Sequence, residues 1–306
     1  MRTALLSERI RGHRTARGLM LISNAAGELR RTVYDCRHTE SQPPRGKLAR
    51  GEGSPKSKDR AVNEAYDGSG DTYRFYQQVL GRNSIDNRGM RLDSFVHYGR
   101  GFNNAFWDGG EMVYGDGDGV LFNSFTRSLD VIAHELTHGV TQFTAPGGLD
   151  YVDESGALNE SFSDVFGSVV KQWKLGQSVN QADWLIGAGI LAKPGWYALR
   201  SLKEPGNPAV TYPGDDQPST MKGYVEGGDV HTNSGIPNHA FYLAAKALGG
   251  NSWGDAAKIW YGALPLLSPN ATFVDAAKAT ISVASALGKK QCDAVTFAWR
   301  AVRVLS

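Results

Sequence analysis

Residues His134, Glu135 and His138 lie in the sequence His-Glu-Leu-Thr-His, and their types and spacing are suited to holding a metal ion. On an α-helix, residues four positions apart lie on one face, so both imidazoles can converge on one ion while Glu135 reaches beside it. A catalytic zinc ion needs three protein ligands and an open position for water. The motif therefore predicts a third ligand elsewhere in the chain.

Glu160 and Asp164 are also four positions apart, on an otherwise apolar segment. We predict that Glu160 is the third zinc ligand. A metal-bound histidine commonly donates its second ring N–H to a carboxylate, which fixes the tautomer, and Asp164 is the candidate for this role. A His-Glu-x-x-His match alone arises by chance in long helices, but this second pair favours a real site at which two helices cross.

The chemistry of such a site follows from its parts. Bound zinc lowers the pKa of a water molecule and polarises a carbonyl group. Glu135 is suited to take the proton of the water and pass it to a leaving amine. These groups predict amide hydrolysis, for which additional oxyanion donors must come from other parts of the chain.

The elements that position these residues follow from the apolar pattern. Helical spacing of apolar residues begins near Ser128 and stops at the Pro-Gly-Gly of residues 146–148, which predicts the first zinc helix. The same pattern predicts further helices over residues 155–173, 236–248, 253–264 and 273–287. The second half of the chain should therefore be mainly helical.

The first half has a different pattern. Residues 92–98 and 111–114 resemble short strands, and the Gly-Asp repeat at 115–119 is predicted to be a turn. We expect a helix over residues 60–80 that is interrupted near 67–71, and a loop or extended connection over 42–56. The sequence predicts an α+β fold with a β-rich first lobe, a helical second lobe and a zinc cleft between them.

The bulk properties are those of an ordinary globular protein. The chain has 306 residues, 41% of them hydrophobic, and 37 glycines, so one large domain or two lobes are expected. No apolar run reaches the length of a transmembrane helix, so no membrane partner is expected. The apolar run at residues 19–22 is too short for a signal peptide, which leaves a cytoplasmic location open.

Charge and cysteine content add two expectations. The formal net charge of +2 combines +7 over residues 1–50 with −5 over the rest, but no recognition module accompanies the basic part. We interpret it as a solvated arm or an electrostatic docking segment and expect no nucleic-acid partner. Cys36 and Cys292 could form at most one disulfide, and two buried free thiols are expected.

Over most of residues 30–306 the chain resembles the thermolysin-like neutral metalloproteases, especially the short-precursor protealysin-like branch. The matching segments, besides the zinc helix, are residues 103–109, 112–119, 130–133, Asn159-Glu160, 200–202 and 230–235. The resemblance implies a two-lobed zincin, a zinc-dependent endopeptidase and one catalytic Zn²⁺. It also implies a basic tail or pro-segment remnant at 1–27, an N-terminal lobe at 28–150 ending in the zinc helix, and a helical lobe at 151–306.

The resemblance assigns roles to residues outside the zinc motif. It implies that His231 and Tyr151 donate hydrogen bonds to the oxyanion, and that Arg200 holds a substrate carbonyl and Glu160. It further implies that the peptide backbone is bound by two residues in the segment 103–107, Asn104 and Ala105. The specificity pocket would be lined by four apolar residues, Phe122, Val131, Ile186 and Leu199, which favours cleavage before a bulky hydrophobic residue.

The family often has a pair of calcium ions near the catalytic region, and this chain departs from that pattern. Asp130 and Asp183 match the calcium ligands, whereas three other matching positions hold Lys171, Leu185 and Ala188. Calcium requires several oxygen ligands, so we predict that the double site is absent. Our hypothesis is that the Lys171 ammonium partly replaces the cation between Asp130 and Asp183.

A second departure lies near His231. The family usually has Asp five residues before this histidine to orient it, and this chain has Glu226 there, while Asp229 lies two residues before it. Either carboxylate remains a candidate. The basic residues 1–27 have three possible interpretations: a truncated pro-segment, a cleavable tail or a start-site artefact.

Two alternative functions belong to other classes. One is a zinc-binding protein that has lost hydrolysis, against which Glu135 and His231 both argue. The other is an aminopeptidase, against which the expected backbone-binding segment at 103–107 argues. The expected partners are peptide or protein substrates and the chain's own pro-segment, the expected state is a monomer, and secretion is typical of the family.

Overall fold

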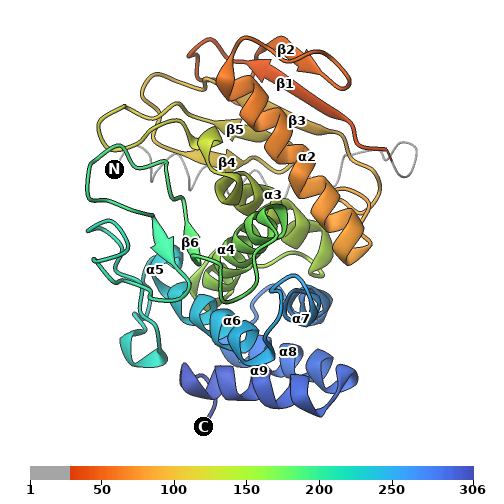
Figure 1. Cartoon of the computed structure of the whole chain (residues 1–306), viewed down its shortest axis with the longest axis vertical. Helices are drawn as coiled ribbons and strands as arrows, with labels where there is room; N and C mark the ends of the chain where they lie inside the picture. Colours follow the sequence, from red (N-terminus) through yellow and green to blue (C-terminus); the bar gives the residue numbers. More distant parts are fainter. Residues whose placement is uncertain (1–27) are drawn as a thin grey trace.

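The computed structural model describes residues 28–306, which form a sheet-containing half and a helical half (Figure 1). The predicted tail at residues 1–27 lies outside the described residues. The main sheet has the order β2-β1-β3-β5-β4, with strands β1 (Arg31–Asp35), β2 (Lys47–Gly51), β3 (Leu92–Val96), β4 (Ala105–Trp107) and β5 (Met112–Tyr114). Neighbouring strands β1, β3 and β5 are parallel, and the edge strands β2 and β4 pair antiparallel. The two predicted strands are confirmed as β3 and β5, each shorter than expected.

Strand β2 corrects the expectation that residues 42–56 form only a loop or connection. Lys47 and Leu48 are exposed, so the strand has no alternating apolar pattern that the sequence could reveal. Its register with β1 shifts between Val33 and Tyr34. The segment is a strand because its backbone pairs with β1. Its charged residue Lys47 is compatible with a position on the edge of the sheet.

Helix α2 (Arg60–Leu80) covers one face of the sheet and is continuous, which corrects the predicted interruption near residues 67–71 (Figure 1). Asp59 caps its first turn by accepting a hydrogen bond from the Val62 N–H, and Gly81 ends it in the left-handed conformation. A Cβ atom at Gly68 would lie 2.5 Å from Ile132 Cδ1. The glycine therefore lets α2 approach the next helix closely and does not break the helix.

The two long helices α3 (Leu129–Thr144) and α4 (Asp153–Leu175) pass between the sheet and the C-terminal helices (Figure 1). Both occur where the sequence predicts helices, although α4 is one turn longer than 155–173. A Cβ atom at Gly167 would lie 2.5 Å from the Asp130 carbonyl oxygen. The absence of a side chain there allows the two helices to lie against each other.

The helical half contains α5 (Val230–Asn233), α6 (Gly235–Leu248), α7 (Asp255–Ala263), α8 (Phe273–Leu287) and α9 (Lys289–Ala301). Its helical character is confirmed, and the bounds of α8 agree with the prediction. Helix α9 was not predicted. It begins with the polar residues Lys289 and Lys290, although Val295, Ala298 and Trp299 further along are buried at helical spacing. Its buried Trp299 stacks on Trp260 of α7 at 6.2 Å, so tertiary packing stabilises this helix.

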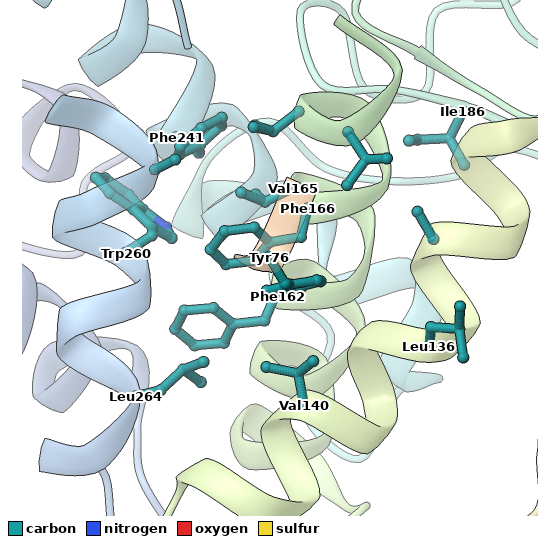
Figure 2. Close-up of a cluster of buried hydrophobic side chains, with 14 of the residues drawn as sticks. Tyr76, Leu136, Val140, Phe162, Val165, Phe166, Ile186, Phe241, Trp260 and Leu264 are labelled. Carbon is teal, nitrogen blue, oxygen red and sulfur yellow. The ribbon is translucent and has the colours of Figure 1, made fainter. Parts of the chain in front are cut away.

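The core of the molecule surrounds α4. Phe162, Val165 and Phe166 of α4 lie between α3 on one side and Phe241 and Trp260 on the other (Figure 2). Burial of these large side chains fixes the two zinc helices against the helical half, at about 2 kcal/mol for each fully buried side chain. No helix within residues 28–306 is long and apolar enough for a membrane span.

The two cysteines are free, as predicted, but only Cys36 is buried. Cys292 is half-buried, and its sulfur accepts a hydrogen bond from Ser285 Oγ at 3.2 Å. The expectation that both thiols are buried was therefore wrong for Cys292. The face of α9 that carries this residue is partly exposed to solvent. Burial raises the pKa of the Cys36 thiol to about 12.

Candidate metal centre and active site

Helices α3 and α4 bring His134, His138 and Glu160 together. The Nε2 atoms of the two histidines lie 3.2 Å apart. Glu160 Oε2 lies 3.3 Å from His134 Nε2, and Glu160 Oε1 lies 3.5 Å from His138 Nε2. All three side chains are buried. The two imidazole nitrogens and the Glu160 carboxylate therefore form a compact triangle inside the protein, at the crossing of the two helices.

The dimensions of this triangle fit a zinc ion. Zinc in tetrahedral sites binds histidine nitrogen and carboxylate oxygen at roughly 2.0–2.1 Å, which places neighbouring ligand atoms about 3.3 Å apart. Glu160 Oε2 accepts no hydrogen bond from any described residue, although it is buried. A buried carboxylate oxygen with no donor is costly unless a cation neutralises it. His134, His138 and Glu160 thus fit the donor set and the spacing that zinc requires.

The nearby imidazoles also set the charge of Glu160. Burial alone would raise the pKa of this carboxyl group, but the imidazoles of His231, His138 and His134 lower it well below the ordinary glutamate value. Glu160 is therefore an anion in the folded protein, which is the form that binds a metal ion.

Asp164 lies behind His134. Its Oδ1 atom is 2.8 Å from His134 Nδ1, so the imidazole donates its second N–H away from the metal position. Asn238 Nδ2 donates to Asp164 Oδ2 at 2.9 Å. Burial alone would raise the pKa of Asp164, but Arg200 and His134 lower it below the ordinary aspartate value. The Asp164 carboxylate is thus charged, and both of its oxygens accept hydrogen bonds.

Arg200 binds Asp164 and not Glu160, which corrects one expectation from the family resemblance. Its Nη2 and Nε atoms donate to the two Asp164 oxygens at 2.7 and 2.8 Å. Arg200 belongs to β7 (Arg200–Ser201), which pairs with β6 (Leu185–Ile186). This planar two-bond geometry suits a guanidinium and a carboxylate, and it explains why the arginine faces Asp164.

The partner of His138 is Asn159, a residue to which the sequence assigned no role. Asn159 Oδ1 lies 2.7 Å from His138 Nδ1. Asn159 Nδ2 donates to the Leu149 carbonyl oxygen, which fixes the orientation of the amide. Asn159 directly precedes Glu160 on α4. Its position next to a predicted metal ligand could have indicated that it contacts the site.

Glu135 lies on the same buried face as the two histidines. The candidate ligand atoms of His134, Glu135 and His138 all lie within 4.8 Å of one another. Glu135 Oε2 accepts a hydrogen bond from the Trp107 backbone N–H at 3.1 Å. Trp107 ends β4, so this contact joins the carboxylate of Glu135 to an edge strand of the sheet.

His231 and Tyr151 lie next to the triangle. The His231 Nε2 atom is 3.5 Å from the Tyr151 hydroxyl oxygen and 3.4 Å from Glu160 Oε2. His231 Nδ1 lies 2.7 Å from Asp229 Oδ1. Among the described residues, Asp229 and not Glu226 contacts this imidazole, because the aspartate caps α5 and also accepts from the His231 backbone N–H at 2.8 Å.

The residues expected to bind substrate come from several segments. Asn104 precedes β4 and Ala105 begins it, with the Asn104 carbonyl oxygen accepting from the Gly115 N–H at 2.9 Å. Of the four expected pocket residues, Val131 and Ile186 are buried and Phe122 and Leu199 are half-buried.

Contacts of the main chain join the segments that carry these residues to β6 and the residues after it. Leu199 N–H donates to the Ile186 carbonyl oxygen at 2.8 Å, and Phe122 pairs with Leu191 across a β-bridge. Asp130, the neighbour of Val131, accepts from the Gly187 N–H at 3.2 Å. The structure thus gathers these segments along residues 186–191.

Lys171 lies between the two aspartates expected of a calcium site. Its Nζ atom is 2.9 Å from Asp130 Oδ2, 2.9 Å from Asp183 Oδ1 and 2.6 Å from the Leu185 carbonyl oxygen. Only 12% of its side chain is exposed. Burial by itself would lower the pKa of Lys171, but the two carboxylates raise it above the ordinary lysine value. The lysine is therefore a buried cation held by three oxygens.

The fold and this site define a class of protein. A family model of the thermolysin metallopeptidase catalytic domain matches residues 23–142, and a model of the alpha-helical domain of the same peptidases matches residues 147–304. The chain therefore belongs to the thermolysin-like M4 family of zinc metalloproteases, and His134, Glu135 and His138 form its His-Glu-x-x-His metal motif. The predicted family, two-lobed fold and enzyme class are confirmed.

Particular relatives are similar over nearly the whole chain. The extracellular metalloprotease of Pectobacterium carotovorum subsp. carotovorum is 49% identical over 292 residues, covering 91% of this chain and 82% of that protein. Protease PrtS of Photorhabdus sp. (strain Az29) is 44% identical over 290 residues, covering 90% and 76%. A solved structure, the precursor of protealysin, a metalloproteinase from Serratia proteamaculans, superposes with a TM-score of 0.86 at 44% identity over 97% of each chain.

Proposed function

We propose that this metalloprotease is an endopeptidase in which Glu135 assists the attack of water on an internal peptide bond. The observation that carries the proposal is the buried triangle of His134, His138 and Glu160, with edges of 3.2, 3.3 and 3.5 Å and Glu135 on the same face. Zinc held by these three residues would polarise the scissile carbonyl and lower the pKa of water.

The residues of the chain then move the proton and hold the charge. Glu135 takes a proton from the attacking water at a carboxylate oxygen and delivers it to the leaving amide nitrogen. The Tyr151 hydroxyl and His231 Nε2 donate to the carbonyl oxygen as it becomes negative. Because Asp229 accepts from Nδ1, donation from Nε2 makes His231 a cation in this step.

Glu135→Gln tests the proposed mechanism. Loss of a general base should lower casein cleavage by roughly 100- to 10,000-fold while the zinc content, measured by atomic emission, stays at the wild-type level. Glu226→Gln is the matched control, because Glu226 is exposed and does not contact His231. Near-wild-type cleavage by Glu135→Gln with zinc bound would rule out the proposed role of Glu135.

Internal cleavage, as opposed to removal of chain ends, is supported by β4. This strand lies at the edge of the sheet beside β5, and its Trp107 N–H reaches Glu135. An extended peptide can lie along such an edge by main-chain hydrogen bonds, with Asn104 and Ala105 as the proposed contacts. Mass spectrometry of products from a peptide blocked at both ends checks this, since an aminopeptidase would leave the peptide intact.

We further propose that cleavage occurs on the N-terminal side of bulky hydrophobic residues. The half-buried Phe122 and Leu199 supply the reachable apolar surface, over the buried Val131 and Ile186. An apolar pocket discriminates by about 1–3 kcal/mol per methylene group. Leu199→Phe, which narrows the pocket, should shift cleavage in a peptide mixture from Phe toward Leu, and an unchanged product pattern would contradict the pocket assignment.

Lys171 is proposed to take the place of calcium in the family's double site. Its ammonium lies where a cation would bridge Asp130 and Asp183, and its contacts with three oxygens support this. Thermal melts with added calcium and with a calcium-selective chelator should then agree closely. A large chelator-sensitive stabilisation that disappears in Asp183→Asn would contradict the proposal.

The precursor state and location are also proposed from the relatives. The protealysin precursor that superposes on 97% of this chain supports residues 1–27 acting as part of a pro-segment. The Pectobacterium relative is named extracellular, which supports action outside the producing cell. Mass spectrometry of the N-terminus of the active enzyme in culture medium tests both, because an unprocessed chain found only in cells would contradict them.

A further inference from the structure

We propose that His38, His97 and Asp116 form a second metal site, separate from the catalytic centre, for a divalent transition metal ion such as zinc. Its residues come from the sheet-containing half, whereas the ligands of the catalytic site come from α3 and α4. Within residues 28–306, two groups of three or more His, Cys, Asp or Glu residues have candidate ligand atoms within 4.8 Å of one another. One is His38, His97 and Asp116, and the other is the motif group His134, Glu135 and His138.

The sheet topology brings the three residues together. His97 follows β3 directly, His38 lies shortly after β1 and Asp116 lies shortly after β5. Since β1, β3 and β5 are parallel neighbours, their carboxyl ends meet at one end of the sheet, which brings the residues that follow them together. The His38 backbone N–H donates to the His97 carbonyl oxygen at 2.9 Å, which ties the two histidine loops to each other.

The distances are near those of a zinc site. His38 Nδ1 lies 3.3 Å from Asp116 Oδ2, which equals the spacing of about 3.3 Å between ligands of tetrahedral zinc. His97 Nδ1 lies 2.8 and 2.9 Å from the two Asp116 oxygens. Widening the His97 contact by about half an ångström would bring it to the same length as the His38 contact, which is the spacing that zinc ligands have.

Asp59 supports His97 on its other side. The His97 Nε2 atom lies 2.9 Å from Asp59 Oδ2. A metal-bound histidine typically donates its second ring N–H to a carboxylate, and the His134–Asp164 pair at the catalytic site has the same form. This second carboxylate fixes the ring of His97 with Nδ1 directed at Asp116 and His38.

The donor set and the exposure define the kind of ion. Two imidazole nitrogens and a carboxylate oxygen favour zinc, cobalt or nickel over calcium and magnesium, which prefer oxygen alone. The side chains of His38, Asp116 and His97 are 48%, 28% and 18% exposed. The ion would therefore enter directly from solvent and keep water in its remaining positions.

An ion pair without metal is the competing interpretation. The hydrogen bond to Asp116 raises the pKa of His97 to about 9, against the opposing effect of burial and with a further contribution from Asp59. His38 also faces Asp116, and Asp35, Glu40 and Asp59 are further carboxylates at this end of the sheet. A metal ion must displace the proton on His97 Nδ1, so binding is measured at a mildly alkaline pH of about 8.

The experiment counts metal ions in the full-length chain. Glu135→Gln serves as the parent protein because it limits self-digestion, and zinc is added by equilibrium dialysis and isothermal titration. The parent should bind about two ions per chain, one tightly and one more weakly. His38→Ala and Asp116→Asn in that background should each bind about one, with circular dichroism confirming that the variants are folded.

Two further variants separate the sites. His231→Ala in the same background should keep both ions, which excludes a second ion bound in the catalytic cleft. Asp59→Asn, which retains an N-cap side chain for α2, should weaken the second ion by about 10- to 100-fold. One ion in the parent, or a second ion that persists in folded His38→Ala and Asp116→Asn, would overturn the proposal.

Discussion

Asp229 accepts a hydrogen bond from His231 Nδ1 at 2.7 Å and also caps the short helix that carries this histidine. One carboxylate therefore fixes both the backbone and the ring of His231. The Nε2 atom is thereby directed toward Tyr151 and Glu160, at 3.5 and 3.4 Å. Glu226, the residue at the position where the family usually has aspartate, does not take part in this arrangement among the described residues.

Asp229→Asn should lower kcat/KM more than Glu226→Gln. Replacing His231 itself should cost roughly 100- to 1,000-fold, as for loss of an oxyanion donor, and Asp229→Asn should cost less because an amide can still cap α5. Steady-state kinetics on a blocked peptide measures the three variants. The proposed orienting role of Asp229 would be wrong if Glu226→Gln lost more activity than Asp229→Asn.

Lys171→Met should destabilise the zinc-loaded enzyme by roughly 3 kcal/mol, because it leaves the buried Asp130 carboxylate without its cation. Asp183 is 45% exposed, so Asp183→Asn is the control and should cost about 1 kcal/mol or less. Unfolding in urea measures both. Adding Asp130→Asn to Lys171→Met should recover much of the loss, and a failure to do so would contradict the buried-charge explanation.

The same pair predicts a pH dependence at alkaline pH. The pKa of Lys171 is raised in the folded protein, so its contribution to stability is complete below the ordinary value of 10.5. It is lost as pH rises through the folded-state pKa. The difference in unfolding free energy between wild type and Lys171→Met should therefore shrink above that pH, whereas a constant difference would argue for a packing effect alone.

At acidic pH the corresponding group is Glu52. Its bonds to Arg31 at 2.6 and 2.7 Å lower its pKa to about 2 despite partial burial, with Tyr66 also donating to it. The stabilisation is present above the ordinary value of 4.5 and is lost as pH falls through about 2. Because Glu52 is 36% exposed, we expect only about 1 kcal/mol after allowance for solvent screening.

Glu52→Gln tests this acidic dependence by urea unfolding of the two proteins at each pH. The variant should be less stable than wild type near neutral pH, and the two should converge as Glu52 of the wild type becomes protonated. Both proteins share the same zinc site, so acid release of the metal affects them alike. A difference in unfolding free energy that stays constant down to about pH 2 would show that Glu52 does not stabilise the protein through its charge.

The sequence was sufficient where local spacing carries the information. The i, i+4 pairs His134 and His138, and Glu160 and Asp164, predicted two helices and their mutual face, because side chains four apart share one face of any α-helix. The uninterrupted α2 could not be foreseen in the same way. Gly68 reads locally as a helix breaker, and only the position of Ile132 on α3 shows that it permits close packing.

Contacts between distant segments were the main omissions. Asn238 donates to Asp164 across 74 positions of the chain, and no local pattern marks this bond. Strand β2 was missed because it depends on pairing with β1 and has no alternating apolar pattern of its own. Helix α9 was missed because its first turn is polar, although Val295, Ala298 and Trp299 are buried at helical spacing. Arg200 was correctly placed at the site but assigned the wrong carboxylate, since Glu160 and Asp164 lie one turn apart on α4.

The two histidines of the metal motif are supported by chemically different partners. His134 donates to the charged Asp164, whereas His138 donates to the neutral Asn159 amide, at 2.8 and 2.7 Å. Asp164→Asn removes a buried charge that also neutralises the half-buried Arg200. It should weaken zinc binding by roughly 10- to 100-fold and destabilise the apo and zinc-loaded proteins alike.

Asn159→Ala is the matched variant, because it removes a neutral partner and leaves no buried charge unpaired. It should weaken zinc binding less than Asp164→Asn does, since a neutral amide oxygen raises the basicity of an imidazole less than a carboxylate does. Competition with a fluorescent zinc chelator measures both affinities. Equal losses in the two variants would mean that Asp164 acts on His134 only by fixing its orientation, and that its charge does not strengthen the metal bond.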